Sequence, residues 1–135
     1  MKEKSGTYKL LHIIMLESYF KREANIDFNN VKFHNDIDLQ MDSKQQDLLL
    51  YVSVTLHFNA RSGDKILIGS KISMTGLFEI PKEKPVLSVE DFSKINAPAI
   101  IFPFIREHLA NMSMKAGIQP ILLPPINFVK LAEEK

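Results

Sequence analysis

The chain has 135 residues, which is enough for one domain and too few for two ordinary ones. It contains no cysteine, so the sequence excludes disulfides, zinc–thiolate sites and thiol catalysis. Seventeen basic and sixteen acidic residues leave a formal net charge of +1, without the basic excess typical of proteins that neutralise nucleic-acid phosphates. We therefore expect a single domain over residues 1–135 that binds no nucleic acid.

The sequence also lacks a run of about 18 apolar residues, the length needed to cross a membrane. The first seven residues are charged and polar, and the apolar stretch 10–16 contains His12, unlike the apolar core of a secretory signal. We interpret this stretch as part of a strand. The sequence therefore predicts a cytoplasmic protein without stable membrane insertion.

The first half of the chain alternates between apolar and polar residues, as strands with one buried face do. Over residues 31–41 the odd positions are apolar apart from Asn35, and the even positions are polar or charged. Residues 48–58 and 66–80 repeat this alternation, and residues 8–21 alternate with apolar side chains on both faces near the middle. Four strands are therefore predicted.

Two short polar connections, 42–46 and 59–64, separate the last three of these strands, and both have the length of hairpin loops. Hairpins join antiparallel neighbours. The simplest arrangement is an antiparallel meander in which each strand pairs with the next one along the chain.

The periodicity changes after Pro85. Ser88 followed by two acidic residues is typical of a helix start. A longer helix is predicted over 98–116, where apolar residues recur every three or four positions, and Gly117 stands where a C-terminal cap is expected. Pro103 lies inside this pattern, so it must start or kink a helical segment.

The chain then becomes apolar and rich in proline. Residues 96–129 contain five of the seven prolines and only three charged side chains. Three prolines within 118–126 prevent a helix and disfavour a central strand, so this segment should be extended. Asn127 is placed to cap a last helix over 128–134. The predicted fold class is α+β: a four-stranded antiparallel sheet, a long kinked helix and a short C-terminal helix.

Three segments carry a family resemblance: NAPAIIFPFIRE at 96–107, QPILLPPINF at 119–128, and GLFEI at 76–80. In order and spacing they resemble the SecB family of bacterial protein-export chaperones. The family fold, four antiparallel strands followed by helices, agrees with the elements that the periodicity predicts.

The resemblance implies an ATP-independent holdase that has no enzymatic activity and no cofactor. It also implies a homotetramer, a dimer of dimers, whose apolar grooves bind unfolded clients and keep preproteins competent for export. Acids near the groove, Asp36, Asp38 and Asp42, would favour basic client segments. The implied groove residues are Phe33, Ile37, Leu39, Met41, Ile121, Leu123, Phe128 and Leu131. The expected subunit contacts are Ile72, Met74, Ile101, Phe102, Ile105, Leu109 and Met112.

The family surface that meets the export motor SecA is acidic. Glu17 matches one acid of that surface, whereas Lys21 and Lys71 stand where two others are expected. Reversing two charges opposite a basic partner could cost several kcal/mol of binding free energy. The sequence therefore predicts either lost delivery to SecA or a matching change in the partner surface.

Other readings of the same residues stay open. A SecB-like chaperone could serve an antitoxin in a toxin–antitoxin system, and an apolar gap between sheet and helix could hold a lipid or another small apolar ligand. Apolar strand faces form the core of any sheet protein. The four histidines lack metal-binding spacing, and the adjacent residues Arg106, Glu107 and His108 point apart on a helix, so no motif supports an enzyme or a metal site.

Overall fold

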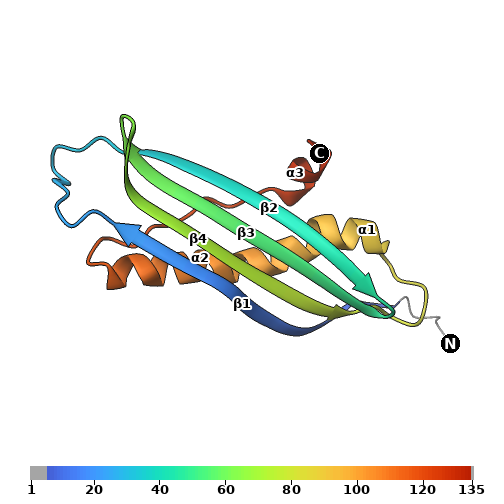
Figure 1. The fold of residues 1–135 in the computed structure, drawn as a ribbon. Coiled ribbons are helices and arrows are strands. Elements are labelled where there is room, and N and C mark those ends of the chain that lie inside the picture. The colour runs from blue at the N-terminus through green and yellow to red at the C-terminus, as the bar shows by residue number, and fades with distance from the viewer. Residues whose placement is uncertain (1–5, 135) are drawn as a thin grey trace.

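The computed structural model describes residues 6–134 as one antiparallel sheet with every helix on the same face (Figure 1). The strands are β1 (Lys9–Arg22), β2 (His34–Gln46), β3 (Leu49–Ser62) and β4 (Lys65–Glu79). After them come α1 (Val89–Asp91), the short π-helix η1 (Phe92–Asn96), α2 (Ala97–Lys115) and α3 (Phe128–Glu133). The predicted α+β class and the order of its elements are confirmed.

The strand order in the sheet is β1-β4-β3-β2, so the predicted meander is right for β2 to β4 and wrong for β1. The chain leaves β1 through a crossover, residues 23–33, and only then enters β2, which gives a Greek-key order. The physical reason is that β4 is buried on both faces. Ser73 and Thr75 point away from the helices, yet they are only 9% and 8% exposed. A meander would leave this buried strand at an edge with unpaired backbone groups, and β1 supplies the missing partner.

The strands are also longer than predicted. Residues 42–46 and 59–62, expected in loops, pair in the ladders of β2 and β3. The turns are only residues 47–48 and 63–64, and each begins at a positive φ. Backbone pairing needs no apolar side chain, which is why the alternation faded before the strands ended.

The core lies between the helix-facing side of the sheet and α2. Alternate residues of β3 from Leu50 to Ala60 are buried, and α2 packs Ile101, Ile105 and Leu109 against them and β4. Burial of a Leu or Ile side chain stabilises a fold by roughly 1.5–3 kcal/mol. This single layer of contacts therefore fixes where α2 crosses the sheet.

The predicted helix signals are confirmed. Ser88 caps α1 by accepting a hydrogen bond from the Asp91 backbone N–H at 3.1 Å, and Asn127 caps α3 in the same way. Helix α2 runs on both sides of Pro103, and Gly117 turns the chain out of it at a φ of 76°. Residues 118–126 form no helix or strand, as the prolines predicted. The π-helix η1 was not predicted.

Sheet and helix approach each other closely at Gly76 of β4. A Cβ atom built there would lie 2.8 Å from Cε2 of Phe78 and 2.9 Å from Cδ1 of Ile101. We expect Gly76→Ala to lower the free energy of unfolding by about 1–3 kcal/mol, because the added methyl group overpacks this contact. Urea unfolding at a fixed protein concentration measures the change.

Gly69→Ala is the matched control, since it is also in β4 and its nearest obstacle is the side-chain oxygen of Asn59 at 3.3 Å. Replacing a strand glycine there removes chain entropy with little crowding, so stability should hold or rise. Equal losses in the two variants would refute the close-packing argument.

Candidate functional site: a groove beside the end of α2

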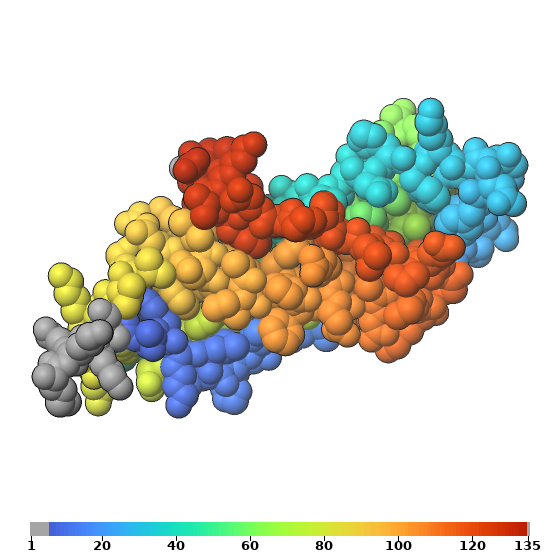
Figure 2. All heavy atoms as spheres, turned by 180° about the vertical axis from the view of Figure 1, so that it is seen from behind, coloured from blue at the N-terminus to red at the C-terminus, as the bar shows by residue number. Residues whose placement is uncertain are grey.

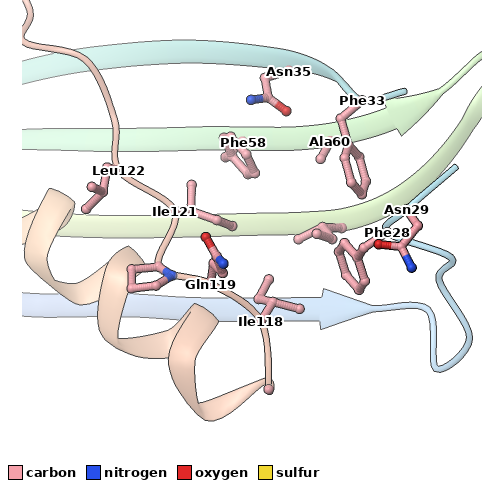
Figure 3. A pocket seen from close by; sticks show the side chains of 13 residues that line it. Phe28, Asn29, Phe33, Asn35, Phe58, Ala60, Ile118, Gln119, Ile121 and Leu122 are labelled. Atoms are coloured by element: carbon pink, nitrogen blue, oxygen red, sulfur yellow. The ribbon is translucent and has the colours of Figure 1, made fainter. Parts of the chain in front are cut away.

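An open groove of about 690 Å³ lies on the helix-facing side of the sheet, beside the C-terminal end of α2 (Figure 3). Its floor is sheet, and its two walls are the crossover 23–33 with the start of β2, and the extended segment after α2. The lining residues are Phe28, Asn29, Phe33, Asn35, Phe58, Ala60, Ile68, Gly117, Ile118, Gln119, Pro120, Ile121 and Leu122.

The crossover wall is aromatic. Phe28 and Phe33 have ring centroids 5.7 Å apart with their planes tilted by 40°, a favourable geometry for an aromatic pair. Phe33 is half-buried, whereas Phe28 is exposed. Figure 3 shows both rings on the same side of the groove, facing the segment that carries Ile118 and Ile121. The wall therefore offers aromatic surface to a ligand.

The opposite wall is held by Ser113, a fully buried residue of α2. Its hydroxyl donates to the Ala110 carbonyl oxygen at 2.7 Å and accepts from the Ile121 backbone N–H at 2.9 Å. A segment with three prolines has few backbone N–H groups of its own and forms no ladder. Ser113 therefore fixes the extended segment, and with it the position of Ile121.

The groove combines apolar surface with three amide side chains, those of Asn29, Asn35 and Gln119. None of the described residues that line it is charged. An amide both donates and accepts hydrogen bonds, so it can satisfy a backbone N–H or C=O whatever side chain the ligand carries. This lining fits an extended polypeptide of varied sequence.

A smaller cavity of about 200 Å³ lies between β2, η1 and α3. It is lined by Met41, Asp42, Ser43, Ser93, Lys94 and Ala132. Strand β2 borders both cavities, but the smaller one is lined by two charged side chains, Asp42 and Lys94, whereas the groove is lined by none.

The structure places the predicted groove residues in different surroundings. Phe33 and Ile121 line the groove, and Met41 lines the smaller cavity. Leu39 and Leu131 are half-buried against the core. Ile37 is 38% exposed on the same side of β2 as Leu39 and Met41.

Two predicted groove residues are buried instead. Leu123 and Phe128 are each 5% exposed, and the Phe128 ring packs edge-on against Phe102 at a centroid distance of 5.8 Å. They offer almost no surface to a ligand. These two apolar side chains therefore pack the C-terminal segment and α3 onto the core.

Most of the lining was not predicted. The missed apolar residues are Phe28, Phe58, Ala60, Ile68, Ile118 and Leu122. Phe58, Ala60 and Ile68 belong to the strand face that any sheet buries, so periodicity could not separate them from the core. Phe28 carried a usable signal, because an aromatic residue inside a polar connection has no core role of its own.

The acids expected beside the groove lie elsewhere. Asp36 and Asp38 are opposite Asn59 and His57 on the bare face of the sheet, the face away from the helices. The Asp36 carboxylate accepts a hydrogen bond from Nε of Arg61 at 2.8 Å. Asp42 borders the smaller cavity. Side chains alternate along β2, so Asp36 and Asp38 lie on the opposite face from Ile37 and Leu39.

The residues expected at subunit contacts are mostly internal. Ile72, Ile101, Ile105 and Leu109 have no exposed surface, Phe102 and Met74 have little, and Met112 is half-buried. They pack α2 onto its own sheet. The other side of α2 carries the exposed apolar residues Ile100, Phe104 and Met114.

Within residues 6–134, no group of three or more His, Asp or Glu side chains is placed to hold a metal ion. No helix in the described part of the chain is long and apolar enough to cross a membrane.

Comparison with known proteins places these features in a family. A family model described as preprotein translocase subunit SecB matches residues 19–135. A protein-export protein SecB from Hyphomonas neptunium is 33% identical over 87 residues, covering 64% of this chain and 52% of that protein. One from Chromobacterium violaceum is 30% identical over 99 residues, covering 71% and 65%. The chain thus spans about half to two-thirds of the length of these relatives.

The fold also matches a solved structure, a SecB-like chaperone from Mycobacterium tuberculosis in complex with a peptide from the HigA1 antitoxin. The TM-score is 0.76, the sequence identity is 10%, and the match covers 89% of this chain and 91% of that one. At this identity the likeness shows a shared fold, and the bound peptide is a property of that protein.

The role of Ser113 as the anchor of the extended wall is testable. We expect Ser113→Ala to leave the part-buried Ile121 N–H without its partner, at a cost of about 1 kcal/mol. Hydrogen exchange of residues 118–122 should accelerate while that of β3 stays slow. Ser43→Ala, at an exposed position of β2, is the control. Unchanged exchange in 118–122 would show that other contacts hold the wall.

Proposed function

The chain belongs to the SecB family, and on this basis we propose that it is an ATP-independent chaperone that binds unfolded polypeptides and keeps preproteins competent for export. The observation that carries the proposal is the groove, with aromatic and aliphatic walls, amide side chains and no charged lining residue. We place this activity in the cytoplasm. In this proposal the groove residues bind the client, catalyse no reaction and need no cofactor.

The physical demands on such a chaperone match this lining. A protein that holds many clients needs apolar contact area with few directional requirements. Burial of apolar surface contributes about 25 cal/mol per Å², and much of this is offset by ordering a flexible client. Amide side chains keep the client backbone hydrogen-bonded without selecting a sequence.

We extend the proposal to a homotetramer, a dimer of dimers. The support is exposed apolar surface outside the groove, since large exposed patches mark interaction sites. Figure 2 shows β1 running along the edge of the sheet beside α2, and as an edge strand it pairs with β4 on one side only. The exposed apolar residues of these two elements are Leu10, Ile14, Met15, Leu16, Tyr19, Ile100, Phe104 and Met114.

The test of the client site is a single substitution in the groove. We expect Phe33→Ser to raise the dissociation constant for an unfolded client about tenfold or more, because burial of a phenylalanine is worth roughly 1.5–3 kcal/mol. Fluorescence anisotropy of a labelled, permanently unfolded protein measures binding, and urea unfolding checks that the variant is folded.

Val86→Ser is the control, because Val86 is an exposed apolar residue between β4 and α1 and does not line the groove. The proposal fails if the unaltered protein neither binds unfolded clients nor delays their aggregation. Native mass spectrometry that finds a retained lipid in a monomer or dimer would favour a lipid-binding function instead.

Contact with the motor SecA is a separate prediction. On the bare face, the Lys71 ammonium pairs with the Glu17 carboxylate at 3.0 Å, so the one acid that matches the family is neutralised. We expect Lys21→Glu combined with Lys71→Glu to tighten binding to SecA at least tenfold at low salt and less at high salt. Calorimetric titration measures this, with Lys82→Glu, in the connection after β4, as the control. Equal affinity in both variants would contradict the prediction.

A further inference from the structure

The last residue of β1, Arg22, joins parts of the chain that are far apart in sequence. It pairs with Ile68 of β4, and its side chain is part-buried at the edge of the groove. Nε donates to the Glu23 carbonyl oxygen at 2.9 Å, and the second terminal nitrogen donates to that of Ala24 at 3.3 Å. The first terminal nitrogen donates to the Ala116 carbonyl oxygen at 2.8 Å.

These three carbonyl groups belong to the two walls of the groove. Glu23 and Ala24 begin the crossover that carries Phe28 and Phe33, whereas Ala116 is the C-terminal cap of α2 and directly precedes the segment that carries Ile118 and Ile121. Among residues 6–134, no other hydrogen bond joins the crossover or β1 to the segment 116–122. One guanidinium group therefore ties both walls to the end of β1.

The guanidinium group also contacts the aromatic wall directly. Its central carbon lies 5.7 Å from the centroid of the Phe28 ring, within the range of a cation–π interaction. Phe28 is 47% exposed, and its ring packs against Phe33. Arg22 therefore supports the ring at the mouth of the groove as well as the backbone behind it.

The positively charged guanidinium group of Arg22 interacts with three carbonyl oxygens and one aromatic ring. No carboxylate of the described residues lies within ion-pair distance of it, and the neighbouring Glu23 pairs with Lys65 at 3.4 Å. The Ala116 carbonyl is at the C-terminal end of α2, where the helix dipole favours a cation. Only arginine offers several donors in one plane together with a flat face for a ring, so lysine cannot replace it.

From this geometry we propose that Arg22 is a positioning residue that sets the separation of the two groove walls, and through it the affinity for unfolded clients. The inference rests on the proposed chaperone function. Arg22 would change the affinity for the client without touching it, since Arg22 does not line the groove.

The test uses Arg22→Lys in the full chain, which keeps the positive charge and removes the fork of donors. We expect the dissociation constant for a permanently unfolded client to rise about tenfold, mainly through faster release. Arg61→Lys is the matched control, because Arg61, like Arg22, donates to a backbone carbonyl oxygen, that of Gly63, but it lies on the side of β3 away from the groove, where it also donates to the Asp36 carboxylate. It should bind clients like the unaltered protein.

A second readout separates positioning from general destabilisation. The chain contains no tryptophan, so Phe28→Trp introduces a single fluorophore at the groove mouth. In this background Arg22→Lys should increase acrylamide quenching of the indole several-fold, and hydrogen exchange should accelerate in 23–33 and 116–122 only. If Arg22→Lys does not fold, Arg22→Gln takes its place in both measurements.

The outcomes distinguish the two proposals. If the unaltered protein binds no client, the chaperone function fails, and the affinity role of Arg22 fails with it. If the unaltered protein binds clients and Arg22→Lys binds them as well as Arg61→Lys does, the chaperone function stands and the positioning role is overturned. Faster exchange over the whole sheet would likewise overturn it, since it would show a merely structural residue.

Discussion

The packing of α2 on the β3–β4 face of the sheet is the contact on which the remaining structure depends. Gly76 lets Ile101 approach the strand closely, and the buried side of α2 then covers this face along most of its length. Because the helix is fixed there, its C-terminal end falls beside the crossover. The chain that leaves Gly117 then crosses the helix-facing side of the sheet, and the groove is the space between that segment and the crossover (Figure 3).

Covering only one face of the sheet gives the molecule two different surfaces. On the bare face, hydroxyl groups of neighbouring strands bond to one another, Ser53 to Thr75 at 2.7 Å and Thr55 to Ser73 at 3.0 Å. Their polar atoms are satisfied without a covering layer, as buried or partly buried polar groups require. The helix-facing side instead combines the core with the groove. The client site and the motor contact that we propose therefore lie on opposite sides of the sheet.

The site was only partly predictable from the sequence. Phe33 and Ile121 line the groove and Met41 lies in the neighbouring cavity, while their role in client binding stays a prediction. Leu123 and Phe128 were misplaced, because an apolar residue after a proline-rich segment looks the same whether it lines a groove or docks the segment. Phe28 and Arg22 were not predicted, because their contacts join residues that are distant in the sequence and that the crossover brings together. The periodicity of a single strand or helix carries no information about such long-range contacts.

The sequence by itself determined the elements: the alternation of β3, the caps at Ser88 and Asn127, the extended proline segment and the membership of the SecB family. These follow from interactions between residues close in the chain, which a local pattern records. The tertiary structure decided the place of β1 beside β4, the side of α2 that stays exposed, and the bridge from Arg22 to Ala116. These depend on which backbone edges and apolar faces find partners across the whole fold, and many strand orders share the same local pattern.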